Sequence, residues 1–435
     1  MKTLQNPVVV IPGITGTSMF DEYPLKADAL WTAVLDKEYQ RLALHPDDLR
    51  YEAVEPAVVR ARALLGAGYD DLLEALRHDL TARSDQPTPV FAFPYDWRQD
   101  VNITGKQLAD FVEEVVARTK LLRHYRGYED NPKVDLVAHS MGGLVICEYL
   151  SQFPTSHRVE KIVTLATPYY GSLEALVKLL TGLGNISGDV PKEREREAAR
   201  SMPAIYQLLP SFKGAVEAIG SKPKPETNLF RVEAWQPGVI DSLGEYIRMH
   251  AVDPGNEKSR NARAPELLKE LLTTAQSHRQ RVRKLKLEAA GLDASKWLVV
   301  AGIGAKTRVR ARVSLVQGKP RFQLLDEDFL NDPATTNTGD NTVPLLGALP
   351  GFIPNESVVA VSPDDFGFWE LKDRALTAQT GFHAMMPNLN LAQRLTLKHL
   401  RGNQYRGEVA GRPVPGVSPA DWSPPIPNLN RITDS

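Results

Sequence analysis

A strand-like run, a serine-containing turn and a helical stretch follow one another without a gap in this chain. Residues 134–138 read Val-Asp-Leu-Val-Ala, which is typical of a buried strand, and residues 144–150 form an apolar helical stretch. Between them, Ser140 is flanked by the small residues Ala138 and Gly142, which allow strand and helix to approach closely. Such a turn holds a serine in a strained backbone position with its hydroxyl projecting from a sheet. Ser140 is therefore predicted to be a nucleophile. The alternative is a buried serine that only supports packing.

Apolar runs with the length of buried strands recur along the chain and alternate with helical stretches. Residues 107–122, for example, carry apolar side chains at the spacing of an amphipathic helix. Alternating strands and helices form a mostly parallel central sheet with helices on both faces, so the predicted class is α/β. The predicted core strands are residues 8–11, 90–93, 134–138, 161–166, 297–301 and 358–361.

A quarter of the chain lies between two predicted core strands and has no strong strand of its own. We interpret it as a helical cap, with a mixed-charge run at 192–197 and an amphipathic helix predicted over 265–290. A hairpin is predicted over 308–325. The predicted division is residues 1–171 as the first part of the core, 172–296 as the cap or lid insertion, 297–410 as the second part of the core, and 411–435 as an extended C-terminal tail.

The predicted cap helix turns basic in its second half. The basic residues are Arg279, Arg281, Arg283, Lys284 and Lys286. A basic amphipathic helix can lie on a membrane surface, which would give the cap a peripheral membrane contact. The alternative is a cap helix whose polar face is simply solvated.

Composition narrows the classes of partner and the cellular setting. The chain has 435 residues with 52 basic and 53 acidic side chains, a net charge of −1 that gives no reason to expect nucleic acid. Its single cysteine, Cys147, excludes an intrachain disulfide and is expected to pack in the core. No apolar run approaches the roughly 18 residues of a membrane span, and no signal peptide can be fitted before Val8. We expect a cytoplasmic protein, with a removed signal peptide as the alternative.

A serine nucleophile needs a histidine base and an acid, and chain order helps to select them. In α/β-hydrolases the acid and then the histidine follow the serine, which favours His383 in the region after the last predicted strand. Asp340, at the apex of a turn-rich segment, is the preferred acid, with Asp332 as its competitor. The histidines judged less suitable by position are His45, His78, His124, His139, His157, His250, His278 and His399.

An acyl-transfer reaction also needs two amide donors for the oxyanion. The N–H of Met141, which directly follows Ser140 at the start of the helical stretch, is one candidate. The N–H of Ile14, in the loop after the first core strand, is the other. Gly13 and Gly16 allow backbone positions there that a side chain would block. The same loop is faintly similar to a phosphate-binding loop, but it lacks the lysine that nucleotide binding would need.

With these segments in place, the chain resembles the lecithin:cholesterol acyltransferase-like family of α/β-hydrolases, particularly its bacterial esterase- and lipase-like members. The most specific segment is Pro-Tyr-Asp-Trp-Arg at 94–98. The matching segments, in the order of the family, are residues 9–17, 93–98, 138–143, 165–168, 203–210, 339–344 and His383.

The resemblance implies the α/β-hydrolase fold with a helical cap, a Ser140–Asp340–His383 triad, and oxyanion donors at Ile14 and Met141. It implies acyl esters of lipids as substrates and no metal or organic cofactor; the sequence itself shows no metal-ligand spacing. Two departures are visible. One cysteine cannot form the disulfide-bounded lid of the vertebrate members, and Asn341 stands where the family commonly has glycine.

Three functions follow from these observations. The leading one is a serine ester hydrolase of carboxylesterase, lipase or phospholipase type that works through an acyl-enzyme. The first alternative is an acyltransferase that passes the acyl group to an alcohol, if the cap excludes water. The second is a non-catalytic protein of the same fold that binds a lipid or a protein.

Overall fold

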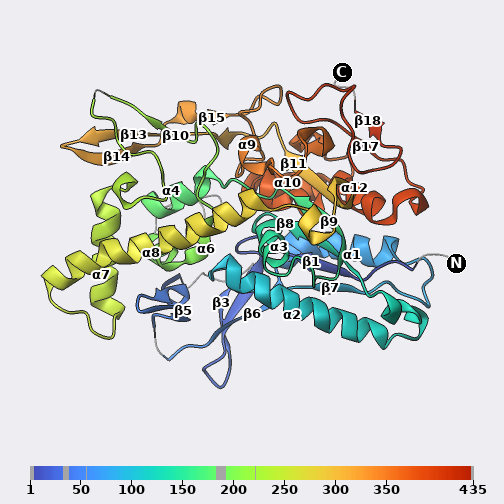
Figure 1. Ribbon diagram of the computed structural model, residues 1–435, viewed down its shortest axis with the longest axis horizontal. Helices are drawn as coiled ribbons and strands as arrows, with labels where there is room; N and C mark the ends of the chain where they lie inside the picture. Colours follow the sequence, from blue (N-terminus) through green and yellow to red (C-terminus); the bar gives the residue numbers. More distant parts are fainter. Residues whose placement is uncertain (1–3, 33–38, 55, 183–192, 221, 433–435) are drawn as a thin grey trace.

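A six-stranded sheet forms the centre of the computed structural model, which describes residues 4–32, 39–54, 56–182, 193–220 and 222–432 (Figure 1). The strand order is β16-β11-β9-β8-β1-β7, and every neighbouring pair is parallel. This confirms the predicted parallel sheet. The strands are β1 (Val8–Ile11), β7 (Val90–Ala92), β8 (Val134–His139), β9 (Val159–Leu165), β11 (Trp297–Gly302) and β16 (Val358–Val361).

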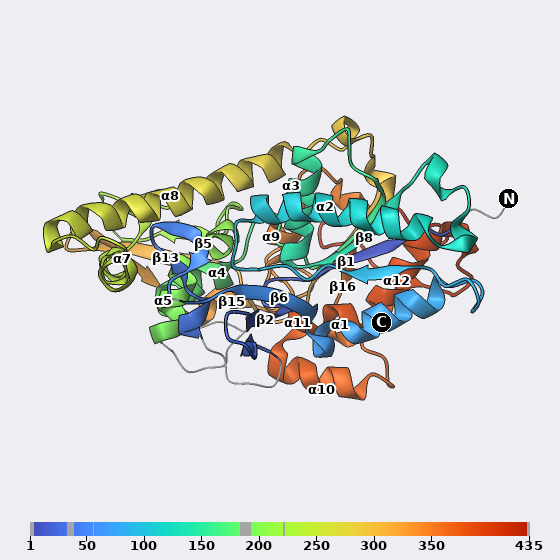
Figure 2. The same cartoon turned by 90° about the horizontal axis from the view of Figure 1, so that it is seen from below.

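Helices cover both faces of this sheet because its strands are apolar on both sides. Val9 and Ile11 of β1 belong to one hydrophobic cluster, together with buried residues of α2 (Val101–Lys120) and α3 (Met141–Gln152). Val8 and Val10 belong to a second cluster, with α1 (Gly66–Asp79) and α12 (Asn390–Arg401). Figure 2 shows α2 above the strands and α1 below them. Alternate side chains of one strand thus serve two separate cores.

Two helices begin earlier than the sequence predicted, because their caps lie upstream of the apolar pattern. Helix α2 starts at Val101, where the Asp100 side chain accepts a hydrogen bond from the Asn102 amide. Helix α8 (Glu257–Lys284) starts eight residues before the predicted position, is capped by Asn256, and runs through Pro265. The proline had been taken as a first helical residue; instead it lies inside the longest helix, which crosses the molecule in Figure 1.

The segment between β9 and β11 contributes helices that pack beside the sheet. They are α4 (Leu173–Thr181), α5 (Glu193–Ser201), α6 (Pro203–Gln207), α7 (Pro237–His250) and α8. The segment also holds a short strand, β10 (Val216–Ala218), that was not predicted; it pairs in parallel with β13 (Ala311–Val316). Strand β13 continues into the predicted hairpin with β14 (Lys319–Gln323), which is confirmed.

An accessory layer follows β1 that the sequence did not predict. It consists of an antiparallel three-stranded sheet of β3 (Asp28–Trp31), β2 (Thr17–Asp21) and β6 (Val59–Leu64), and of the pair β4 (Leu44–His45) and β5 (Asp48–Glu52). Strand β6 reads Val-Arg-Ala-Arg-Ala-Leu and is largely exposed or half-buried, so its apolar signal is weak. This layer begins directly after the loop that carries Ile14.

The C-terminal segment packs against the edge of the sheet. Ala360 of β16 donates a backbone hydrogen bond to Arg412, and the indole of Trp422 donates to the Val358 carbonyl. Strands β17 (Ala410–Gly411) and β18 (Asn430–Arg431) pair in parallel. The tail thereby covers an edge that would otherwise offer unpaired backbone groups. The remaining elements are β12 (Thr307–Arg308), β15 (Phe329–Leu330), α9 (Leu345–Ala348), α10 (Leu371–Thr380) and α11 (Phe382–Met385).

Candidate active site

Ser140 occupies the sharp turn between β8 and α3 that the sequence predicted. Its backbone angles, φ 52° and ψ −126°, lie in a region that non-glycine residues rarely adopt. Helix α3 starts so close to the neighbouring strand β1 that a Cβ at Gly142 would lie 2.5 Å from the Ile11 carbonyl oxygen. The Ser140 amide donates to the Leu165 carbonyl at 2.8 Å, which ties the turn to strand β9. The strained turn is therefore held from both sides.

The three residues predicted as a triad are in hydrogen-bond contact. The imidazole Nε2 of His383 lies 2.8 Å from Ser140 Oγ, and its Nδ1 lies 2.8 Å from Asp340 Oδ2. A carboxylate can only accept, so Nδ1 carries the hydrogen and the Nε2 lone pair is left to accept from the serine hydroxyl. This is the tautomer that a general base needs. The catalytic roles of the three residues stay predictions; their geometry fits those roles.

Asp340 is held rigidly beside Gly302, the last residue of β11. Its Oδ1 accepts hydrogen bonds from the amides of Thr342 and Val343 at 3.0 and 2.6 Å. Next to it, Asn341 has φ 78°, a left-handed conformation that glycine adopts freely and that asparagine tolerates better than most residues. The departure from glycine at this position thus keeps the turn.

His383 lies in a short helix rather than in a loop. It is the second residue of α11, after Gly381 with φ 89°. The His383 amide donates to the Asp340 carbonyl at 3.0 Å, so backbone as well as side chain joins the two residues. The glycine separates α11 from α10 and lets the chain turn back toward the sheet.

The competing residues are engaged elsewhere. Asp332 is exposed, and its carboxylate accepts a hydrogen bond from the Ala334 amide, as in a turn cap. His399 is buried in α12 between the carbonyls of Pro425 and Lys296, and burial lowers its pKa to about 4. Neither side chain lines the cavity that contains Ser140.

The predicted oxyanion loop reaches Ser140 because Gly13 has no side chain. A Cβ at Gly13 would lie 2.8 Å from the Ser140 Cβ. Ile14 lines the same cavity as Ser140, and Met141 is the first residue of α3, where a helix amide has no acceptor within the helix. Both residues therefore lie close to Ser140, and the role of their amides in binding an oxyanion stays a prediction.

The segment 94–98 fastens this loop. The Tyr95 hydroxyl donates to the Pro12 carbonyl at 2.8 Å, and the Trp97 indole donates to the Thr17 carbonyl at 3.2 Å, so both ends of the loop are held. Arg98 is completely buried and bonds to Asp96 and Glu52 at 2.7 and 2.8 Å. The arginine thereby joins the accessory layer to the sheet. The most specific part of the resemblance thus supports the geometry of the site.

A second histidine touches the site, one that sequence reasoning had set aside. Tyr69 Oη accepts from the Gly13 amide at 2.8 Å and lies 2.9 Å from His139 Nδ1, while His139 Nε2 lies 2.9 Å from the His383 carbonyl oxygen. One tautomer of His139 satisfies all of these hydrogen bonds: the Tyr69 hydroxyl donates to Nδ1, and Nε2–H donates to the His383 carbonyl. Burial, and then the neighbouring His383, lower the pKa of His139 well below its usual value. This series of hydrogen bonds connects the predicted oxyanion loop to His383, the predicted base.

A cavity of about 340 Å³ opens over Ser140 and His383. Its walls come from the accessory layer, the segment 173–208 and the residues around His383, and most of its lining side chains are apolar or aromatic. Lining residues that were not predicted include Trp31, Tyr39, Glu174, Lys178, Met202 and Ile205. No local pattern marks these residues in the sequence, because they come from separate segments that only the fold brings together.

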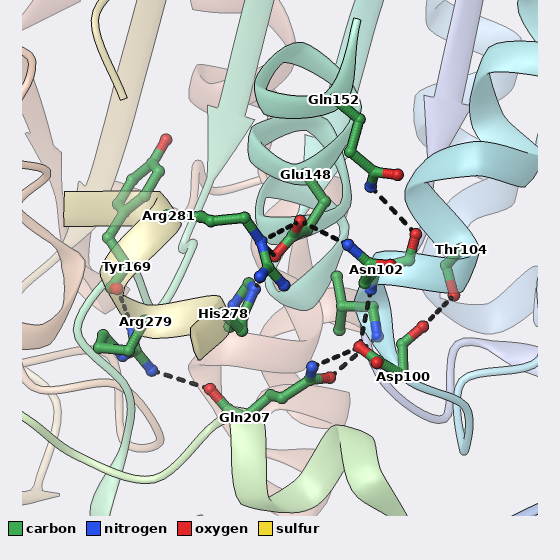
Figure 3. A network of polar contacts seen from close by, with 11 residues as sticks. Asp100, Asn102, Thr104, Glu148, Gln152, Tyr169, Gln207, His278, Arg279 and Arg281 are labelled. Atoms are coloured by element: carbon green, nitrogen blue, oxygen red, sulfur yellow. Dashed lines mark hydrogen bonds and ion pairs between the residues drawn. The ribbon is translucent and has the colours of Figure 1, made fainter. Parts of the chain in front are cut away.

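Two of the basic residues of α8, Arg279 and Arg281, face the molecule (Figure 3), whereas Arg283, Lys284 and Lys286 are exposed. Arg281 pairs with Glu148 of α3 at 2.8 Å, and His278 Nδ1 lies 2.5 Å from the same carboxylate. Arg279 is buried and donates to the carbonyls of Tyr169, at a short distance, and Gln207, at 2.8 Å. These side chains fix α8 behind the nucleophile helix. The predicted membrane contact of this helix stays a prediction, as does its alternative, a polar face that is simply solvated.

The described ranges contain neither a metal-binding cluster of side chains nor a helix suited to span a membrane. Within them, no three His, Cys, Asp or Glu side chains gather in a way that could hold a metal ion. None of the helices in those ranges combines the length and the apolar character needed to cross a membrane.

Comparison with known proteins agrees with this geometry. The family model described as lecithin:cholesterol acyltransferase matches residues 75–250. Phospholipase A(1) LCAT3 of Arabidopsis thaliana is 27% identical over 176 residues, which are 36% of this chain and 36% of that protein. The uncharacterized protein YJR098C of Saccharomyces cerevisiae is 27% identical over 172 residues, 38% of this chain and 23% of its own length. The chain thus spans about a quarter to a third of these relatives.

A solved structure extends the similarity to nearly the whole chain. A chain of the Tle4-Tli4 complex superimposes with a TM-score of 0.59 at 14% identity, covering 93% of this chain and 100% of that chain. At this identity the likeness concerns the fold. The parallel sheet, the serine turn and the family match, which covers fewer than half of the residues, together support a lecithin:cholesterol acyltransferase-like α/β-hydrolase.

Proposed function

We propose that this protein is a serine ester hydrolase that cleaves acyl esters of lipids through Ser140, His383 and Asp340. The observation that carries the proposal is the continuous contact from Asp340 through His383 to Ser140, at 2.8 Å each, beside a largely apolar cavity. A serine hydroxyl is a weak nucleophile until a base of suitable tautomer accepts its proton. All three groups needed for this activation are present in one place.

The proposed reaction follows from the positions of these atoms. Ser140 Oγ attacks the acyl carbonyl while its proton passes to His383 Nε2, and the amides of Ile14 and Met141 receive the negative charge on the carbonyl oxygen. His383 then gives the proton to the departing alcohol as the C–O bond breaks, leaving an acyl-enzyme. Water, deprotonated by the same nitrogen, attacks the acyl carbonyl and releases the acid and Ser140.

Two observations support a lipid substrate. The walls of the cavity are mainly apolar, which suits an acyl chain. The family model and the Arabidopsis relative, by their descriptions an acyltransferase and a phospholipase A(1), act on lipids. We propose residues 172–296 as a cap, because residues of α4, α5 and α6 line the cavity over Ser140.

The test is hydrolysis of p-nitrophenyl esters of increasing chain length by the wild-type protein and by Ser140→Ala. We expect activity with the wild type, none above background with the variant, and a preference for longer acyl chains. An organophosphonate should label the wild type once per chain and leave the variant unlabelled. A wild type that is folded, inactive on every ester and not labelled would instead indicate a binding protein of this fold.

Acyl transfer to an alcohol is the second candidate, favoured by the description of the matching family. It differs only in which nucleophile resolves the acyl-enzyme. Hydrolysis and transfer products should be measured together while an alcohol is titrated into the reaction. Product ratios that do not respond to the alcohol would exclude transfer.

A further inference from the structure

Glu174 places a carboxyl group in the wall of the proposed substrate cavity. It lies on α4, and together with Ala175 and Lys178 of the same helix it lines the cavity that contains Ser140. Among the residues that the structure describes, no hydrogen bond or ion pair involves this carboxyl group, while its backbone amide donates to Ser172 Oγ. Glu174 is half-buried, and a carboxyl group that is partly removed from water without a partner is unfavourable for folding. Its presence in this wall therefore asks for a reason outside the folded chain.

The helix dipole of α4 explains only in part why an acidic residue stands at position 174. Glu174 is in the first turn of α4, where a negative charge interacts favourably with the helix dipole. That effect needs only an exposed side chain near the N-terminus. It does not explain why Glu174 lines a mainly apolar cavity, where burial raises the pKa of its carboxyl group to about 7.

We propose that Glu174 is a specificity-determining residue that hydrogen-bonds a hydroxyl group of the ester substrate. This inference rests on the proposed function, since it names a feature of the substrate cleaved at Ser140. The hydroxyl belongs either to the acyl chain or to the alcohol part of the ester. In both cases the substrate supplies the partner that the folded chain does not.

A hydroxyl fits this environment better than a cationic group does. Near neutral pH the carboxyl group exchanges between its two protonation states, and a hydroxyl can donate to the ionised form and accept from the neutral form. An ammonium group can pair with the ionised form alone. In addition, the positive charges of Arg308 and Lys178 act on Glu174 and would repel a cationic substrate.

The experiment compares matched esters that differ by one hydroxyl group. For the acyl arm, p-nitrophenyl alkanoates are paired with the same chains hydroxylated at successive positions. For the alcohol arm, a monoacylglycerol is paired with the methyl ester of the same fatty acid. A choline ester of that acid serves as the cationic probe. Each is measured with the wild type, Glu174→Gln and Glu174→Leu, and with Met202→Leu as an apolar-for-apolar control in the same cavity.

The readout is the ratio of kcat/KM between the hydroxylated ester and its plain partner. We expect the wild type to prefer the hydroxylated ester in one arm, and Glu174→Leu to reduce that ratio by about tenfold or more. Glu174→Gln should keep part of the preference, because an amide both donates and accepts, and Met202→Leu should keep all of it. The position of the preferred hydroxyl shows whether Glu174 contacts the acyl chain or the alcohol part of the ester, and how far from the ester bond this contact lies.

Stability gives a second readout that a purely structural role would not produce. Removing an unpaired carboxyl group should raise the Tm of Glu174→Leu, whereas loss of a favourable helix-dipole contact would lower it. Equal ratios in wild type and Glu174→Leu, or a preference for the choline ester, would overturn the inference while leaving ester hydrolysis intact. A wild type inactive on every ester would contradict the proposed function and, with it, the inference.

Discussion

Helix α3 contacts two histidine–carboxylate pairs that look alike and do different things. At its N-terminal end, His383 and Asp340 meet at 2.8 Å beside Ser140. Two turns further along, Glu148 meets His278 at 2.5 Å (Figure 3). In both pairs the Nδ1 atom contacts a carboxylate oxygen. What differs is the partner on the other side of the ring.

His383 presents Nε2 to the hydroxyl of Ser140 in the wall of a cavity, whereas His278 has no partner there. Among the described residues, no hydrogen-bond partner reaches His278 Nε2, and both His278 and Glu148 are completely buried. Burial lowers the pKa of His278 and outweighs the opposing effect of Glu148, so the ring stays neutral. A histidine–carboxylate pair alone is therefore not a catalytic site. A histidine of such a pair can act as a base only where a nucleophile is within reach and a substrate has space to bind. Without these, the pair only stabilises the packing.

The largest effect on activity is expected from removing the nucleophile, because Ser140 is what distinguishes the His383–Asp340 pair from the His278–Glu148 pair. Ser140→Ala should lower kcat by about 10⁶-fold, as expected when the nucleophile of a triad is lost. The Tm should change little, since the Ser140 side chain serves as no helix cap. Steady-state hydrolysis and thermal unfolding check the two parts. Substantial residual activity would show that another group attacks the ester.

Asp340→Asn tests whether the carboxylate of the first pair fixes the tautomer. The amide would donate to Nδ1 and leave the hydrogen on Nε2, which then cannot accept the Ser140 proton. We expect kcat to fall by about 10³- to 10⁴-fold with KM little changed. Asp332→Asn is the matched control, because Asp332 is exposed and remote from the cavity lining, and it should leave kcat unchanged.

The corresponding change in the second pair should act on stability instead. Glu148→Gln leaves His278 and Arg281 without the carboxylate they share, so the free energy of unfolding should fall by about 3 kcal/mol or more. The kcat of the folded protein should be retained. Glu114→Gln is the control: its partner Arg118 is exposed, so the loss should stay below about 1 kcal/mol. A large loss of kcat at full stability would make the two pairs equivalent after all.

The second pair also shows where sequence reasoning stopped. The elbow and the sheet were predictable, because apolar runs and a serine between small residues are local signals, and chain order then selected Asp340 and His383. Glu148 had a signal that went unused: a single acidic residue in the apolar stretch 144–150 that must be paired if it is buried. Its partner His278 lies 130 positions away, and only tertiary packing joins them.

The accessory layer and the cavity wall were harder to predict. The strands of the layer are short, and all but β2 are partly exposed, so they lack the apolar pattern that marks a buried strand. Strand β6 carries arginines at two of its six positions. Glu174 looked like an ordinary helix residue. Its significance comes from where α4 lies, and no local pattern carries that information.

Tyr69→Phe probes the contact that supports the first pair and has no counterpart in the second. Loss of the hydroxyl leaves the Gly13 amide and His139 Nδ1 without a partner and frees the His139 ring to turn away from the His383 carbonyl. We expect kcat to fall by about tenfold with a small change in KM, because only positioning is lost. Tyr125→Phe, which removes a hydrogen bond to the Gln5 carbonyl, should leave kcat unchanged.

The smallest expected effect is a dependence of stability on pH that originates in the second pair. The folded-state pKa of His278 is lowered, so below its unfolded pKa of about 6.5 the unfolded chain binds a proton that the folded chain does not. The free energy of unfolding should therefore decrease as the pH falls from about 7 to about 5.5. The pKa of Glu148 is also lowered, because hydrogen bonds from His278 and Arg281 outweigh burial, so its contribution persists in this window and is lost only at more acidic pH.

His278→Gln isolates this contribution, because an amide can still donate to Glu148 but does not titrate. The decrease in Tm between about pH 7 and about pH 5.5 should be smaller in the variant than in the wild type. It should not vanish, since burial also lowers the pKa values of His399 and His157 in the folded chain. If the two proteins lost stability in parallel, the His278 ring would carry its proton in the folded state, and the second pair would be an ion pair rather than a neutral fastening.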